Sequence, residues 1–177
     1  MRAAFGLALT SALLVACIHV SGCAQEGKAL RTNQGETLTD VSPFRIFNPD
    51  TMPKPAGRYS QVAEVSGGKT VYISGQIPLD RSGSLVGKDD FRAQVQQVFE
   101  NLKAAVEAAG GDFHSVIKLN YYCPASVDTA AQIPVVREIL DQYIDPAHPP
   151  TGTFLVVNRL ARPEWLLEVE AVAVVKK

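Results

Sequence analysis

The sequence predicts an α+β domain in which two helices cover one face of a sheet. Apolar residues recur every three or four positions from Asp89 to Ala109, which is typical of an amphipathic helix. They alternate from Leu166 to Val175 instead, which is typical of a strand with two different faces. A shorter helix is predicted from Pro134 to Tyr143, because proline fits the first turn of a helix. One face of the final strand is wholly apolar, so we expect both helices to pack there.

Residues 1–22 have the composition of a secretory signal peptide. Arg2 precedes an apolar run of about 16 residues that contains no acidic residue and is shorter than a membrane-spanning helix needs. The run leads into Val20-Ser21-Gly22-Cys23, which resembles a bacterial lipoprotein signal. The sequence therefore predicts a lipid anchor on Cys23 and a place in the bacterial cell envelope, facing the periplasm. The alternative is ordinary cleavage near Ala24 and secretion.

The rest of the chain divides into a lead-in and one domain. Residues 23–58 are polar and rich in Gly and Pro, which predicts a lipid-anchored tether and an extended segment that docks through Phe44, Ile46 and Phe47. Residues 59–177 are long enough for a single domain and contain no internal repeat.

The elements of this domain follow from local patterns. Strand-like runs on either side of Ser66-Gly67-Gly68 predict a hairpin. The long helix has acidic residues at its start, where the helix dipole favours them, and Gly110-Gly111 at its end. Alternating residues from Ser115 to Cys123 predict a further strand, and the stretch from His148 to Arg159 leads into another.

The second face of the final strand predicts self-association. Glu168 and Glu170 alternate there with large apolar side chains, so the face is neither a solvated surface nor a core. A sheet left half-apolar on its open side is most simply covered by further copies of the same chain.

Charge and cysteine content exclude several classes of protein. The formal net charge is −1 and no basic run is present, which argues against nucleic-acid binding. Cys17 lies in the signal peptide and Cys23 is the predicted lipid site, which leaves Cys123 as a buried small side chain rather than half of a disulfide. His114 and His148 do not have metal-ligand spacing, so no metal site is predicted.

Three stretches of this domain resemble the RidA/YjgF family of reactive intermediate deaminases. They are "RYSQVAEVSGGKTVYISGQIPLD", "QVQQVFENLKAAVEAAGGDFHSVIKLNYYC" and "LEVEAVAVV", and the resemblance covers Tyr59 to Lys177. It implies a chorismate-mutase-like α+β fold with a mixed sheet, and a homotrimer with clefts between its subunits. It also implies hydrolysis of a small imine or enamine to a carbonyl compound and ammonia, without a metal or organic cofactor.

The resemblance assigns roles to individual residues. Glu168 would position the attacking water, while Tyr59, Ser74 and Gly75 would line the cleft. The family's carboxylate-binding Arg should stand two residues after Pro150, where this chain has Gly152 followed by Thr153. The substrate-binding set therefore comprises Tyr59, Ser74, Gly75, Gly152 and Thr153.

The missing arginine makes classical 2-iminoacid deamination doubtful. Arg58 immediately precedes Tyr59 and could replace the missing cation, although we favour a solvated surface arginine. Arg159 lies about 20 Å along the strand and is too far away. A polar residue of the family, an Asn on the second helix, falls near Val136. The alternative to an enzyme is a non-catalytic trimer at the cell envelope that binds a small metabolite or serves as a scaffold.

Overall fold

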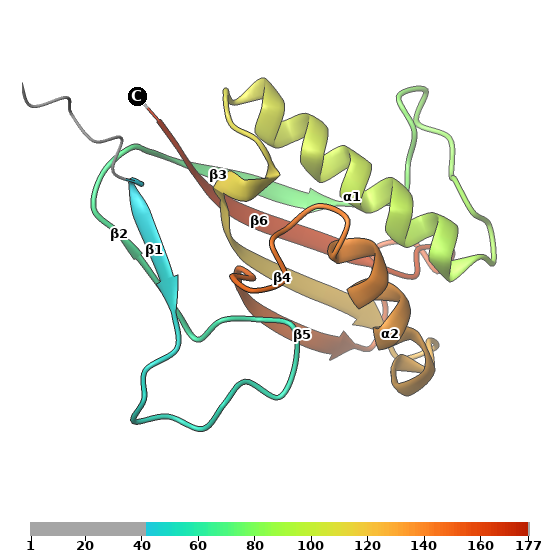
Figure 1. Ribbon diagram of the computed structural model, residues 1–177. Coiled ribbons are helices and arrows are strands. Elements are labelled where there is room, and N and C mark those ends of the chain that lie inside the picture. The colour runs from blue at the N-terminus through green and yellow to red at the C-terminus, as the bar shows by residue number, and fades with distance from the viewer. Residues whose placement is uncertain (1–41, 177) are drawn as a thin grey trace, which may run out of the picture. The chain divides into compact units, whose positions relative to one another are not determined.

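The computed structural model describes residues 42–176, which form two sheets and two α-helices. β1 (Phe44–Phe47) and β2 (Val62–Val65) pair in a small antiparallel sheet. The main sheet has the order β3-β6-β4-β5, as Figure 1 shows. Its strands are β3 (Lys69–Gln76), β4 (Val116–Pro124), β5 (Thr151–Val157) and β6 (Glu168–Val175). Because β5 runs parallel to β4 and the other pairs are antiparallel, the predicted mixed sheet is confirmed.

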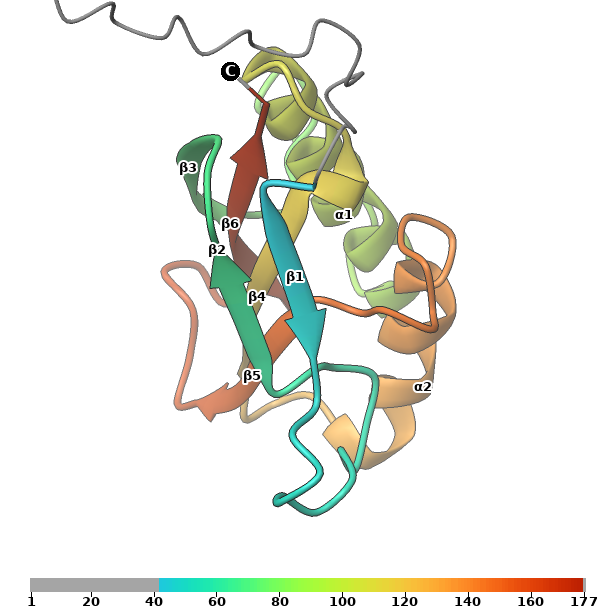
Figure 2. The ribbon, with the colours of Figure 1, turned by 60° about the vertical axis from the view of Figure 1, so that its left-hand side comes forward.

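Both helices lie on the same side of the main sheet, as predicted (Figure 2). They are α1 (Phe91–Ala108) and α2 (Thr129–Leu140), and a short 3-10 turn, η1 (Phe113–Ser115), precedes β4. The predicted signal peptide and the lipid site on Cys23 lie outside the described residues. Within residues 42–176, no helix has the length and apolar character needed to cross a membrane.

The long helix forms where its periodicity predicts it. Asp90 caps its start by accepting a hydrogen bond from the Ala93 amide at 3.1 Å, and Gly110 follows its end with a φ of 90°. Its sheet-facing residues are completely buried. They are Val95, Val98, Phe99, Leu102 and Val106.

The shorter helix begins earlier than predicted. The Asp128 side chain accepts a hydrogen bond from the Ala131 amide at 3.3 Å, and this cap sets the first residue at Thr129. Pro134 consequently lies inside α2. Proline cannot donate to the carbonyl of Ala130, but Ala130 is exposed, so water can satisfy that carbonyl. The predicted start at Pro134 was therefore wrong.

The predicted hairpin at Ser66-Gly67-Gly68 is also wrong, because the turn joins two different sheets. β2 pairs with β1 and β3 pairs with β6. The Pro43 carbonyl accepts hydrogen bonds from the amides of Ser66 at 2.9 Å and Gly67 at 3.1 Å, which ties the end of β2 to the start of β1. Gly68 then redirects the chain with a φ of 80°.

The final strand has the two faces that its alternation predicts. Leu167, Val169, Ala171, Ala173 and Val175 are at most 4% exposed and belong to the core beneath the helices. The opposite face carries partly exposed Glu168, Glu170 and Val172. Tyr72 on β3 pairs with Val172 and is 82% exposed. The face of the main sheet away from the helices, which we call the open face, is thus half-apolar within the described chain.

The thiol of Cys123 is buried, as predicted. The residue has no exposed surface, and its Sγ lies 3.5 Å from the Leu166 carbonyl oxygen. Burial raises the pKa of this thiol to about 11, so it stays protonated at neutral pH. Cys123 therefore contributes packing rather than a thiolate nucleophile.

Candidate functional site

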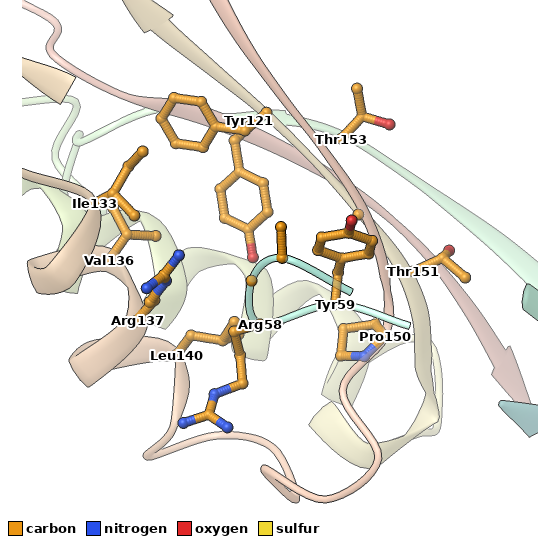
Figure 3. A pocket seen from close by; sticks show the side chains of 14 residues that line it. Arg58, Tyr59, Tyr121, Ile133, Val136, Arg137, Leu140, Pro150, Thr151 and Thr153 are labelled. Carbon is orange, nitrogen blue, oxygen red and sulfur yellow. The ribbon is translucent and has the colours of Figure 1, made fainter. Parts of the chain in front are cut away.

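A cavity of about 260 Å³ lies between α2, the edge strand β5 and the segment that precedes β2 (Figure 3). The parallel register places Gly152 beside Leu119 and Phe154 beside Tyr121, so this part of β5 faces the helices. α2 closes the opposite side with a mostly apolar wall. Its cavity-lining residues are Ile133, Val136, Arg137 and Leu140.

Three of the predicted binding residues meet in this cavity: Tyr59, Gly152 and Thr153. The segment carrying Tyr59 runs beside β5, because the Ser60 amide donates a hydrogen bond to the Pro150 carbonyl at 3.1 Å. A Cβ placed on Gly152 would lie 3.4 Å from the Cβ of Tyr59. Tyr59 therefore packs directly over the position that holds the carboxylate-binding arginine in the RidA pattern.

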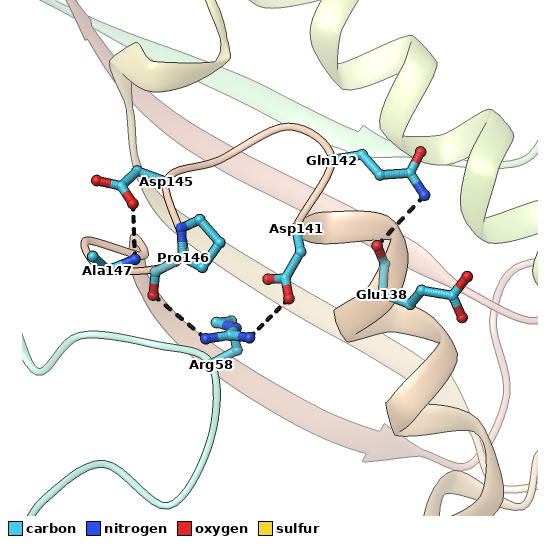
Figure 4. A network of polar contacts seen from close by, with 7 residues as sticks. All are labelled: Arg58, Glu138, Asp141, Gln142, Asp145, Pro146 and Ala147. Atoms are coloured by element: carbon cyan, nitrogen blue, oxygen red, sulfur yellow. Dashed lines mark hydrogen bonds and ion pairs between the residues drawn. The ribbon is translucent and has the colours of Figure 1, made fainter.

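The cavity has two arginines on its lining, and Arg58 is already paired. Its Nη2 donates to the Asp141 carboxylate at 2.8 Å, and its Nη1 donates to the Pro146 carbonyl at 3.4 Å (Figure 4). Figure 3 shows its guanidinium extending away from the cavity. Arg58 is thus held by α2 and the loop that follows it, and its guanidinium is not available to a ligand in the cavity.

Arg137 was missed by the sequence analysis. A Cβ placed on Gly57 would lie 3.3 Å from Arg137 Nη2, so the guanidinium lies beside Gly57 on the cavity lining. Arg137 has no side-chain hydrogen bond or ion pair within residues 42–176. Helical spacing could have indicated its position, because Arg137 lies four residues after Ile133 and three before Leu140, on the same face.

A second group of predicted residues lies at a bulge between β3 and β6. Ile73 pairs with Ala171 but Gln76 pairs with Val169, so β3 has one extra residue around Ser74 and Gly75. The Glu168 side chain fills the space that a side chain on Gly75 would need. A Cβ there would lie 2.8 Å from Glu168 Cδ. The structure therefore brings Gly75 and Glu168 together, as the predicted site requires.

The two carboxylates of β6 differ in their hydrogen bonding. Glu170 Oε1 accepts from Asn120 Nδ2 at 2.7 Å and from the Tyr122 hydroxyl at 3.0 Å. Glu168 accepts no hydrogen bond from any residue between 42 and 176. Burial and then the neighbouring charge of Glu170 raise the pKa of Glu168 above that of an ordinary glutamate. Glu168 is therefore the carboxylate that can bind a water and exchange a proton with it.

The predicted residues form two separate groups in one chain. Ser74 lies with Asn120 and Glu170 in a shallow hollow on the open face, and neither Ser74, Gly75 nor Glu168 lines the cavity that contains Tyr59. Among residues 42–176, no group of three or more His, Cys, Asp or Glu side chains could hold a metal ion.

Comparisons with known proteins agree with this fold. The family model described as endoribonuclease L-PSP matches residues 50–175. Protein DfrA of Myxococcus xanthus is 35% identical over 130 residues, which cover 73% of this chain and 95% of that protein. A 2-iminobutanoate/2-iminopropanoate deaminase of Dermatophagoides farinae is 29% identical over 136 residues, covering 77% of this chain and 100% of that protein.

A solved structure shows the same architecture. The crystal structure of the Rid-family protein YyfB from Yersinia pestis matches with a TM-score of 0.68 and 34% sequence identity, over 76% of this chain and 100% of that one. The match of the family model extends over well more than half of the sequence. The chain therefore belongs to the endoribonuclease L-PSP family, the RidA/YjgF family that its sequence motifs predicted.

Proposed function

We propose that this protein hydrolyses the imine or enamine of a small metabolite, with Glu168 positioning the water. The observation that carries the proposal is the half-buried Glu168 carboxylate, which has a raised pKa and no hydrogen-bond donor among residues 42–176. Two relatives support the class of substrate: the Dermatophagoides farinae protein named above, and a protein of Acinetobacter baylyi named 3-aminoacrylate deaminase RutC that is 28% identical.

The chemistry requires only water and proton transfer. Glu168 accepts a hydrogen bond from the water, whose oxygen forms a bond to the imine carbon while a proton passes through the carboxylate to the nitrogen. The C–N bond then breaks, ammonia leaves and a carbonyl group remains. One water is consumed for each ammonia released, and no oxidant or reductant is needed. The raised pKa of Glu168 lies closer to neutral pH than that of an ordinary glutamate, so the carboxyl group can more readily both accept and return a proton.

We propose further that three copies associate through the open face and complete the clefts between them. Tyr72 is 82% exposed and Leu155 is 46% exposed, which leaves apolar surface for a partner to cover. The separation of Glu168 from the Tyr59 cavity within one chain supports a site completed by a neighbouring copy. Residues 1–22 and Cys23 support export and lipid anchoring of this assembly at the cell envelope.

The test compares Glu168→Gln with Glu107→Gln, an exposed glutamate on α1. The substrate is 2-iminobutanoate generated in solution by an amino-acid oxidase, and the measurement is its rate of conversion to 2-oxobutanoate and ammonia. We expect Glu168→Gln to lose about 100- to 10,000-fold in rate while its fold is retained, because a positioned acid-base group contributes about that much. Glu107→Gln should match the wild type.

Two results would contradict the proposal. Full turnover by Glu168→Gln would remove the carboxylate from the mechanism. A wild-type protein that binds 2-oxobutanoate but converts no imine would instead favour the non-catalytic binding trimer. The absence of a charged residue at Gly152 is the observation on which that alternative rests.

A further inference from the structure

The cavity beside α2 carries a cation, Arg137, that has no ion-pair partner among residues 42–176. Arg137 lines it from the last turn of α2 and is an exposed residue, and its Nη2 lies 3.3 Å from where a Cβ on Gly57 would be. The neighbouring cations are occupied within the described chain. Arg58 binds Asp141, and Arg92 binds Glu138 in a bidentate pair at 2.7 and 2.9 Å. Arg137 has no such partner among residues 42–176.

A tyrosine hydroxyl in the same cavity is also without a partner. Tyr121 is only 8% exposed, yet its hydroxyl forms no hydrogen bond with any residue in the described part of the chain. Tyr121 lines the cavity, so its hydroxyl can donate to a molecule bound there. Burial raises the pKa of Tyr121, which keeps the group protonated and able to donate. Figure 3 shows Arg137 and the Tyr121 hydroxyl directed into the cavity.

The cavity is small and much of its wall is apolar. Ile133, Val136, Leu140 and Phe154 contribute apolar side chains, and Tyr59, Thr151 and Thr153 also line it. Its volume of about 260 Å³ is below the range of about 300–1,000 Å³ that holds drug-sized ligands. A guanidinium and a hydroxyl donor in a small, largely apolar cavity match a carboxylate with a short aliphatic or unsaturated tail.

We propose that Arg137 of α2, assisted by the Tyr121 hydroxyl, binds the carboxylate of the small acid that this protein acts on. The inference rests on the proposed function, because the acid is taken to be the substrate or product of the hydrolysis. In this proposal the cation is on α2, across the same cavity from Gly152 of β5. Two guanidinium groups in so small a space would repel each other, so glycine at position 152 and arginine at position 137 are compatible choices.

A purely structural role for Arg137 makes a different prediction. A cation in the last turn of a helix interacts favourably with the helix dipole. Its loss would then lower the stability of α2 without changing the preference of the cavity for a charged ligand. Ligand preference, rather than stability, therefore separates the two roles.

The experiment measures binding of 2-oxobutanoate and of the uncharged 2-oxobutanamide by isothermal titration calorimetry. It uses the purified full chain, with detergent present throughout, as wild type, Arg137→Gln, Arg137→Lys and the control Arg81→Gln in an exposed loop. We expect Arg137→Gln to weaken 2-oxobutanoate binding about 10- to 100-fold, which is the effect of losing a charge-assisted pair. Binding of the amide should be unchanged. Arg137→Lys should lie between these values, and Arg81→Gln should match the wild type.

A rescue variant excludes loss of folding as the explanation. Gly152→Arg added to Arg137→Gln returns a cation to the cavity from β5, and a Cβ at this position meets only ordinary contacts of 3.4 Å or more. We expect it to restore much of the preference for the acid over the amide. The proposal is overturned if Arg137→Gln binds 2-oxobutanoate as the wild type does, or if the wild type does not prefer the acid to the amide.

The carboxylate-binding role of Arg137 and the proposed hydrolysis can be tested independently of each other. Hydrolysis is tested by the loss of turnover in Glu168→Gln, and carboxylate binding is tested by the preference for the acid over the amide in Arg137→Gln. If Arg137→Gln binds 2-oxobutanoate normally while the wild type hydrolyses the imine, only the proposed role of Arg137 is refuted. If Arg137→Gln binds the acid more weakly but the wild type hydrolyses no imine, the proposed reaction is refuted and the carboxylate site stands.

Discussion

Gly75→Ala tests whether the position of Glu168 matters for the reaction. The added Cβ would lie 2.8 Å from Glu168 Cδ and 3.0 Å from its Cγ. Carbon atoms pack best at about 3.5 Å, so the Glu168 side chain must move by about 0.7 Å at Cδ. Its carboxylate oxygens lie further from the backbone and must move at least as far.

This displacement should affect catalysis more than stability. A misplacement of about 1 Å can cost about 100-fold in rate, whereas overpacking at one position typically costs about 1–3 kcal/mol. We therefore expect Gly75→Ala to lower kcat/KM for 2-iminobutanoate by about 100-fold in the coupled oxidase assay. Urea unfolding should show that the domain still folds.

Gly67→Ala is the matched control. No atom lies within 4 Å of a Cβ at Gly67, so the substitution should leave both rate and stability essentially unchanged. If Gly75→Ala kept more than about half of the wild-type kcat/KM, a displaced Glu168 would have no effect on the water, and Glu168 would not position it. An equal loss in Gly67→Ala would show that the assay reports something other than this contact.

Further predictions concern pH, core hydrogen bonding and assembly. The raised pKa of Glu168 should move the acidic limb of the kcat/KM profile above the ordinary glutamate value, and Glu168→Gln should remove that limb. The same shift stabilises the fold at low pH, and this stabilisation is lost as the pH rises through the folded-state pKa of Glu168. Between low and neutral pH, the melting temperature of Glu168→Gln should therefore fall less than that of the wild type. Gln94 is completely buried, and its side chain donates to two backbone carbonyls and accepts from one backbone amide. Gln94→Leu should therefore lower the free energy of unfolding in urea by about 3 kcal/mol, and a loss below about 1 kcal/mol would contradict this. Tyr72→Glu places a charge on the open face beside Val172 and should yield smaller species in sedimentation velocity, whereas an unchanged oligomer would show that this face is not the interface.

The two elements with the longest periodic patterns were predicted correctly. α1 and β6 each carry an uninterrupted repeat of apolar residues, and the core forms where those repeats meet. Local periodicity is informative there because burial of one continuous face outweighs weaker local preferences. Family membership likewise followed from motifs in the printed sequence.

The errors occurred where a local signal competed with a more distant contact. Ser66-Gly67-Gly68 has the composition of a hairpin turn, but β2 pairs with β1 from the lead-in because the Pro43 carbonyl binds the turn. Pro134 suggests a helix start, but the Asp128 cap begins α2 one turn earlier. Composition identified a turn and a helix in these two places but could not identify their partners.

Local patterns were enough to predict the α+β class and the buried face of β6, and motifs identified the family and the missing arginine at position 152. The ion pair between Arg58 and Asp141, and the lack of such a partner for Arg137 within the described chain, became visible only in the fold. Arg137 and Gly57 are 80 positions apart in the sequence and meet because α2 packs over the edge of the sheet. The sequence shows which residues are charged, but whether a charge is neutralised depends on which distant groups the fold brings within a few ångströms.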